Sequence, residues 1–257
     1  MNTAHLHPIR CQTCSLSSLC LPLSLSLADV EQFDTIVRRR APLTPGETLY
    51  MQGETFENVY AVRSGSLKQT IIEANGEEQI TSFYLPGELV GLDSIDSAVH
   101  PGFLTALERT TVCEIPFRRL ENLSEHLPEL RHQLYRCMSR EIVDDRRLMR
   151  LLSSKTADER LASFFRNLSV RFDRCGQSAE RFRLPMSRSD IGTYLGLAIE
   201  TISRVLGRFQ QQGVLNIQGR HVEILDMAAL SERAGIIAPC CDERHRARDH
   251  AGPSGRQ

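Results

Sequence analysis

The 257-residue chain contains no tryptophan and no apolar run long enough for a membrane-spanning helix. A helix that crosses a bilayer needs about 18–20 consecutive apolar residues. The segment 16–27 is rich in serine and leucine, but Cys20 and Pro22 interrupt it, and it has no small-residue cleavage site of the kind found in signal peptides. We therefore expect a cytoplasmic protein that does not associate with membranes.

The sequence also lacks the motifs of several common enzyme classes. It contains no dinucleotide-binding fingerprint, no Walker phosphate loop and no Ser-His-Asp pattern. We therefore predict that the chain is not an enzyme.

The formal net charge of −1 conceals two parts of opposite charge. Residues 1–145 contain 12 Lys and Arg against 20 Asp and Glu, a net charge of −8. Residues 146–220 contain 14 Lys and Arg against 6 Asp and Glu, a net charge of +8. An acidic body followed by a basic module indicates that the second part binds a polyanion.

The pattern of residues 131–153 predicts one long helix with two apolar faces. The first, which we call the dimer face, has steps of three and four residues, as in a two-stranded coiled coil. It comprises Tyr135, Met138, Ile142, Asp145, Met149 and Leu152. The second stripe can pack on the chain's own domains, and it comprises Leu130, Leu134, Cys137, Leu148 and Leu151. The alternative is a core helix with one broad apolar face.

Asp145 is the one acidic residue of the dimer face. In a homodimer it meets the same residue of the second copy, and two carboxylates held together away from water repel each other. We therefore expect a weak dimer that an additional interaction can switch on.

Three of the eight cysteines, Cys11, Cys14 and Cys20, form a C-x2-C-x5-C run near the N-terminus. In a reducing compartment such a run is more often a metal site than a disulfide framework. Three thiolates leave a four-ligand site one short, and Cys113, in the strand-like segment 110–115, is the best candidate for the fourth. The spacing alone leaves an iron–sulfur cluster, a zinc ion and no metal as alternatives.

Residues 41–117 consist of short β-rich runs separated by turn signals about ten residues apart, which predicts a small sandwich or barrel. A helix over 28–39, capped by Ser26, precedes these runs. The expected strands are 48–52, 59–63, 67–72, 79–85 and 110–115.

The segment 187–213 predicts a helix-turn-helix. Ser187 and Asp190 cap a first helix, Gly196 makes the turn, and a second helix follows over 199–211. The outer face of the second helix comprises Glu200, Ser203, Arg204 and Gly207. A Glu–Arg pair four residues apart is usually a surface ion pair, but in this motif Arg can bind guanine and Glu can accept from cytosine.

Four stretches together resemble one family, the FNR branch of the CRP superfamily, whose members are oxygen-responsive regulators of anaerobic metabolism. They are CQTCSLSSLC at 11–20, VCEIP at 112–116, DIGTYLGL at 190–197 and ETISR at 200–204. The resemblance covers about residues 11–230. It implies an α+β fold with an N-terminal, jelly-roll-like β-roll sensor domain, a long dimerisation helix and a C-terminal winged helix-turn-helix.

We accordingly divide the chain into five parts. They are a cysteine-rich cluster-binding segment (1–27), the β-roll (28–127), the dimerisation helix (128–153), the DNA-binding domain (154–230) and a tail expected to be disordered (231–257).

The resemblance also implies a cofactor and partners. The cofactor is a 4Fe-4S cluster on Cys11, Cys14, Cys20 and Cys113, and the partners are double-stranded DNA, RNA polymerase and a second copy of the chain when the cluster is present. The residues expected to bind a TTGAT-type DNA half-site are Glu200, Ser203 and Arg204, with Thr201 and Arg188. The candidate polymerase contact comprises Glu73, Gly76 and Glu77.

Two questions stay open at this stage, and one class of ligand is not expected. Ser15 and Leu19, beside ligating cysteines, either control oxygen access or are ordinary loop residues. No cyclic nucleotide is expected, because no Lys or Arg lies between Gly87 and Ala106 to pair with its phosphate. The alternatives for the whole chain are a zinc- or disulfide-stapled CRP-type regulator of another signal and a redox enzyme with an iron–sulfur centre.

Overall fold

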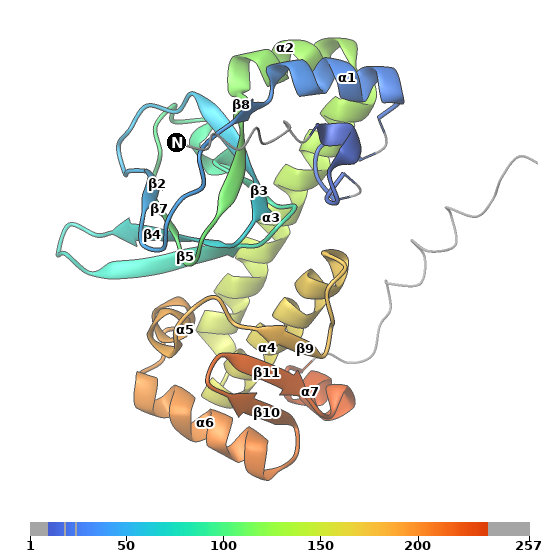
Figure 1. The fold of residues 1–257 in the computed structure, drawn as a ribbon. Coiled ribbons are helices and arrows are strands. Elements are labelled where there is room, and N and C mark those ends of the chain that lie inside the picture. Colours follow the sequence, from blue (N-terminus) through green and yellow to red (C-terminus); the bar gives the residue numbers. More distant parts are fainter. Residues whose placement is uncertain (1–9, 18, 24, 236–257) are drawn as a thin grey trace, which may run out of the picture.

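The computed structural model describes residues 10–17, 19–23 and 25–235. It shows an α+β protein in which a β-roll and a smaller helical domain are joined by one long helix (Figure 1). Cys240, Cys241 and most of the expected tail lie outside the described residues. The expected tail begins too early, because residues 227–233 form a helix.

The β-roll consists of two four-stranded antiparallel sheets, with strand orders β1-β8-β3-β6 and β2-β7-β4-β5. The strands are β1 (Arg38–Arg39), β2 (Thr48–Tyr50), β3 (Asn58–Ser64), β4 (Leu67–Ile72), β5 (Glu78–Tyr84), β6 (Leu89–Val90), β7 (Phe103–Ala106) and β8 (Thr111–Pro116). Side chains from both sheets, including Leu43, Val62 and Leu104, fill the space between them. The predicted sandwich is therefore confirmed.

The β4–β5 hairpin turns at Asn75 and Gly76, a residue pair typical of tight hairpin turns. Gly76 has a φ of +84°, a conformation that glycine adopts without steric strain. The Asn75 side chain accepts a hydrogen bond from the backbone N–H of Glu77. Local turn chemistry therefore fixes the tip of this hairpin.

Helices and helical turns cover the end of the β-roll that carries the cysteine segment. They are η1 (Cys11–Thr13), α1 (Leu27–Ile36), η2 (Leu92–Ser94) and α2 (Phe117–His126). The predicted helix over 28–39 is too long, because Arg38 and Arg39 leave the helix and pair with Glu114 and Cys113 of β8. Pairing with the sheet edge satisfies backbone groups that further helical turns would otherwise have satisfied.

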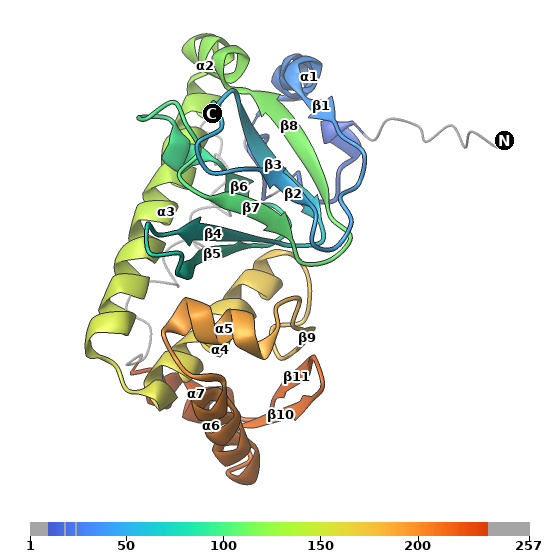
Figure 2. The same cartoon turned by 90° about the vertical axis from the view of Figure 1, so that its left-hand side faces the viewer.

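The long helix α3 (Pro128–Ser154) runs along the β-roll and reaches the C-terminal domain (Figure 2). The stripe expected to face the chain's own body does so. Leu130 and Leu134 are buried against the β-roll, and Leu151 packs on the core of the C-terminal domain.

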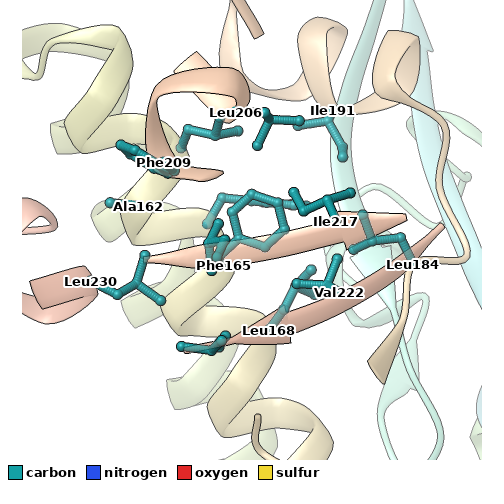
Figure 3. Close-up of a cluster of buried hydrophobic side chains, with 14 of the residues drawn as sticks. Ala162, Phe165, Leu168, Leu184, Ile191, Leu206, Phe209, Ile217, Val222 and Leu230 are labelled. Atoms are coloured by element: carbon teal, nitrogen blue, oxygen red, sulfur yellow. The ribbon is translucent and has the colours of Figure 1, made fainter. Parts of the chain in front are cut away.

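The C-terminal domain packs four helices around a three-stranded sheet of order β10-β11-β9. Its elements are α4 (Ala157–Arg174), β9 (Arg181–Arg183), α5 (Arg188–Leu195), α6 (Ile199–Gln211), β10 (Leu215–Gln218), β11 (His221–Ile224) and α7 (Met227–Arg233). Phe165 and Leu168 of α4 meet Ile217 and Val222 of the sheet in its core (Figure 3). The cap predicted at Ser187 and Asp190 is present as a capping box, and Thr156 with Glu159 forms a second one at the start of α4.

The two domains share one apolar core. Ile80, Phe83 and Leu85, in and just after β5, pack with the buried side chains of α4 and α5. The rings of Phe83 and Tyr194 lie 5.0 Å apart. None of the helices in the described part of the chain is long and apolar enough to cross a membrane.

Candidate functional site

The N-terminal cysteines lie beside Cys113, although about ninety residues separate them in the sequence. Cys11 in η1, Cys20 and Cys113 on β8 pack against one apolar cluster that includes Phe33 and Ile115. The thiol of Cys14 interacts electrostatically with those of Cys20 and Cys113. The fold therefore brings the four predicted ligands into one region.

Cys137 of α3 packs against the same apolar cluster and interacts electrostatically with Cys20. The sequence offers no signal for this proximity, because it depends on how α3 rests on the β-roll. Cys137 is thus a rival to Cys113 as a fourth ligand, and an experiment must separate the two.

Burial makes three of these cysteines, Cys11, Cys20 and Cys113, harder to deprotonate. Burial raises the pKa of Cys20 to about 12, and it also raises the pKa values of Cys11 and Cys113. Among the described residues, no three His, Cys, Asp or Glu side chains are already close enough to hold one metal ion. Metal binding at these thiols must therefore remove protons and draw the segment 11–20 inward.

Asp34, which sequence reasoning did not single out, ties the cysteine segment to the β-roll. Its carboxylate accepts a hydrogen bond from the backbone N–H of Cys11 at 3.0 Å and pairs with Arg39 at 2.6 Å. Burial alone would raise the pKa of Asp34, but these bonds from Cys11 and Arg39 lower it. A charged Asp34 thus anchors the segment that carries three of the four thiols.

The two residues beside these cysteines have different surroundings. Ser15 is exposed, whereas Leu19 is half-buried beside Gly87. Leu19 therefore contacts the β-roll, and Ser15 faces solvent.

The helix-turn-helix depends on two glycines. A side chain at Gly192 would place its Cβ only 2.7 Å from the carbonyl oxygen of Leu197, so α5 can approach the turn only with glycine there. Gly196 ends α5 with a φ of +61°. These two positions set the angle at which α6 leaves α5.

Helix α6 buries one face and exposes the predicted DNA-reading face. Glu200, Ser203 and Arg204 are exposed, Thr201 is half-buried, and Arg188 is exposed at the start of α5. Arg204 donates to Thr201 Oγ1 at 3.2 Å. Glu200 and Arg204 both lie in the described part of the chain, and no ion pair joins them. A Cβ at Gly207 would meet no atom within 4 Å, so a DNA backbone can approach α6 closely there.

The tip of the β4–β5 hairpin, with Glu73, Gly76 and Glu77, is exposed. Both strands of the hairpin contact α5. Lys68 pairs with Asp190 at 2.7 Å, and the Gln79 amide donates to the carbonyl oxygen of Thr193. The candidate polymerase contact therefore lies on the same hairpin that supports the helix-turn-helix.

The residues of the dimer face do not share one environment. Tyr135, Ile142 and Met149 are 58%, 52% and 68% exposed, and Asp145 is exposed among them. Met138 packs on the chain's own β-roll core, and Leu152 is half-buried beside Gly196. Four of the six predicted residues are therefore exposed and two are partly covered by the chain's own domains, and the dimer face of six stays a prediction.

A group of acidic residues that sequence reasoning missed lies where α3 meets the β-roll. Glu141 of α3 accepts a hydrogen bond from the Tyr84 hydroxyl, and Gln69 donates to Asp93 at 2.6 Å. Burial, together with the charges of Asp93 and Asp145, raises the pKa of Glu141 to about 7. This stretch of α3 therefore places a carboxyl group of raised pKa against the β-roll, in addition to the exposed Asp145.

Comparison with known proteins agrees with this architecture. The cyclic nucleotide-binding domain profile matches residues 40–126, and the Crp-like helix-turn-helix profile matches residues 159–233. The solved structure of FixK2 from Bradyrhizobium japonicum is 31% identical, with a TM-score of 0.70, and the match covers 79% of this chain and all of that one.

The chain is 58% identical to the transcriptional activator protein FnrA of Stutzerimonas stutzeri over 88% of its own length and 92% of that protein's. It is 57% identical to the transcriptional activator protein anr of Pseudomonas aeruginosa over the same shares. The chain belongs to the FNR branch of the CRP superfamily. It is therefore an anaerobic transcription regulator that binds DNA, and not an enzyme.

In this FNR-type regulator, the pKa of Glu141 predicts how stability depends on pH. Its folded pKa of about 7 lies above its ordinary value of 4.5, so its contribution to stability is full at low pH and is lost as the pH rises through that interval. Between about pH 5 and pH 8, the free energy of unfolding should fall by about 1–3 kcal/mol more in the wild type than in Glu141→Gln.

Denaturant titrations of the metal-free chain measure this difference. Glu125→Gln, at an exposed carboxylate, is the control and should follow the wild type. Parallel pH curves for the wild type and Glu141→Gln would show that Glu141 is ionised throughout.

Proposed function

We propose that this regulator senses oxygen through a 4Fe-4S cluster held by Cys11, Cys14, Cys20 and Cys113. The observation that carries the proposal is the meeting of the N-terminal thiols with Cys113 in one apolar region. Four thiolates from irregularly spaced positions suit an iron–sulfur cluster better than a structural zinc ion, whose ligands usually come in two close pairs.

A bound cluster would supply a centre that reacts with oxygen. The chain's own residues prepare the site for it. Apolar neighbours such as Phe33 limit water around the thiols, and Asp34 fixes the start of the segment. Burial raises the pKa of the Cys20 thiol, so a thiolate without a bound metal is disfavoured there. Binding of the cluster would therefore couple deprotonation of the thiols to a rearrangement of the segment 11–20.

We propose that the signal controls dimerisation through α3. The exposed Tyr135, Ile142 and Met149 are suited to burial against a second copy, and Asp145 opposes it. In such a dimer the two α6 helices would meet a pseudo-palindromic DNA site about 34 Å apart, one turn of the double helix. A TTGAT-type half-site is the proposed target of Glu200, Ser203 and Arg204.

The ligand of the β-roll differs, in this proposal, from that of the cyclic-nucleotide regulators. Residues 87–106 include no Lys or Arg, and Asp93 and Glu141 place carboxylates between the β-roll and α3. A phosphate would find no cation in residues 87–106 and would meet these acidic side chains. The exposed tip with Glu73 and Glu77 remains the proposed contact for RNA polymerase.

Anaerobic purification followed by visible absorption, iron and acid-labile sulfide measurements tests the proposed cofactor. About four irons and four sulfides for each chain, with a visible band that bleaches in air, would support it. A colourless protein containing zinc would instead support the regulator of another signal.

Substitution of single cysteines tests the ligand set. Cys113→Ser should abolish iron and sulfide incorporation and oxygen-regulated DNA binding, because it removes the only thiolate that β8 contributes. Cys137→Ala is the matched control, since its thiol lies against the same apolar cluster, and Cys175→Ala is a second control. Both should retain iron and sulfide. If Cys113→Ser keeps both elements and Cys137→Ala loses them, α3 supplies the fourth ligand.

The role of Arg204 in base reading is tested with two DNA sites. Arg204→Ala should weaken binding by about 1–3 kcal/mol on a site that keeps its G·C pair, because Arg binds the guanine edge bidentately. On a site where that pair is replaced, the loss should be much smaller. Equal losses in fluorescence-anisotropy titrations on both sites would mean that Arg204 contacts phosphate.

The role of Asp145 is tested in air, without a cluster. Asp145→Ala should remove the repulsion between two carboxylates and let the apolar residues of the dimer face associate, so sedimentation should show a dimer that binds DNA. Asp145→Glu keeps the charge and should stay monomeric. Asp144→Ala, which removes a neighbouring charge paired with Arg147, should also stay monomeric. A monomeric Asp145→Ala protein would place the switch elsewhere.

A further inference from the structure

The loop of residues 85–88 between β5 and β6 touches the cysteine segment on one side. Gly87 has a φ of +88°, and a Cβ added there would lie 3.0 Å from the Cβ of Leu19. The backbone N–H of Gly87 is also fixed, since it donates to the carbonyl oxygen of Val62. The loop therefore cannot move away from Leu19 without losing its own anchor, and a Cβ at Gly87 would require Leu19 or the loop to shift by a few tenths of an ångström.

The same loop is joined to the DNA-binding domain by a two-pronged ion pair. Nε of Arg171, on α4, donates to Glu88 Oε1 at 2.8 Å, and Nη2 donates to Glu88 Oε2 at 2.6 Å. Arg171 Nη2 also donates to the carbonyl oxygen of Phe83. The Arg171 side chain is only 17% exposed, so loss of its partner would leave a largely buried charge uncompensated.

A third contact of the loop is made by Pro86, the residue before Gly87. The Cys175 thiol, directly after α4, donates to the carbonyl oxygen of Pro86 at 3.0 Å. Glu88 is itself held in place, because Oε2 accepts from the backbone N–H of Leu85. Four consecutive residues thus contact the cysteine segment, the β-roll and the last turns of α4.

We infer that the loop 85–88 is a positioning element that links the cysteine segment to α4 and holds the DNA-binding domain in its DNA-reading orientation. Glu88 and Arg171 are its positioning residues. The hydrogen bonds described above join the loop to α4 and to the β-roll and not to α3, although the charge of Asp144 on α3 also acts on Arg171. The inference rests on the proposed function in one respect, that the cysteine segment carries the signal.

The ion pair is tested by a double-mutant cycle in the full-length, anaerobically prepared protein. Glu88→Gln and Arg171→Gln should each weaken binding to the full DNA site about tenfold, and the double variant should lose little more, because the two residues act as a unit. Iron, sulfide and the dimer mass should stay at wild-type values. Additive losses, or no loss, would overturn the assignment.

A merely structural role is separated by the spacing of the half-sites. The wild type should discriminate strongly against a site expanded by one base pair, and Glu88→Gln should discriminate less, because its DNA-binding domains are less firmly oriented. Glu108→Gln is the control, since it breaks the more exposed Arg183–Glu108 pair between the same two domains. It should keep the discrimination of the wild type, and unchanged discrimination in Glu88→Gln would overturn the positioning role.

The contact with Leu19 is tested by two glycines of matched conformation. Gly87→Ala and Gly53→Ala place alanine at similar positive φ values, but nothing lies within 4 Å of a Cβ at Gly53. Gly87→Ala should therefore weaken DNA binding more than Gly53→Ala, and Leu19→Gly, which removes the contacted Cβ, should abolish the difference when added to Gly87→Ala. Equal effects of the two alanines would remove the cysteine segment from the link.

Failure of the proposed cluster can be told apart from failure of this link. Amide hydrogen exchange in the last turns of α4, measured without DNA, should be faster in Glu88→Gln than in the wild type, whether or not the chain holds iron. If the wild type binds no iron and exchange is still faster in Glu88→Gln, the proposed cluster is refuted and the link is kept. Unchanged exchange would refute the link even in a protein with full iron.

Discussion

The packing of Leu130 and Leu134 against the β-roll orients α3, and the rest of the molecule depends on that orientation. Because an α-helix repeats every 3.6 residues, burial of this stripe turns Tyr135, Ile142 and Met149 outward. The same rotation brings Glu141 to the β-roll carboxylate Asp93 and Cys137 to the N-terminal thiols. A single apolar contact thus places the face for a second copy, a buried acid and a rival cysteine at fixed positions.

At the other end of α3, Arg160 connects the helix to the DNA-binding domain. Its guanidinium donates to the carbonyl oxygens of Leu152, Lys155 and Leu195, at 2.8–3.0 Å. The last carbonyls of a helix have no partner within it, and here an arginine of α4 bonds one of them together with the end of α5. The direction of α3 is therefore transmitted to the helix-turn-helix through hydrogen bonds, in addition to the apolar core that the two domains share.

Local chemistry explains which features the sequence could predict. The capping boxes, the hairpin at Asn75 and Gly76, and the turn at Gly196 each depend on residues close together in the chain, and the structure has all of them. The early end of α1, the anchor from Asp34 to Cys11 and the burial of Glu141 against Tyr84 depend on partners 23 to 76 residues away. No spacing rule reports such contacts, because they arise only when β8, α1 and α3 have already packed. The gathering of Cys113 with the N-terminal thiols was predicted because three ligands needed a fourth and because the family resemblance implied the same residue.

In the proposed switch, the carboxylates on α3 limit association with a second copy of the chain. A helix face made only of residues such as Ile142 and Met149 would bury itself against a second copy whatever the state of the cysteines. Asp145 on that face opposes burial, and Glu141 beneath it adds charge to the same stretch of helix. A change of about 5.5 kcal/mol is enough to move a two-state equilibrium from almost all of one form to almost all of the other. In the proposed switch, the acids hold the free chain near the point where ordering of the cysteine segment can decide the outcome.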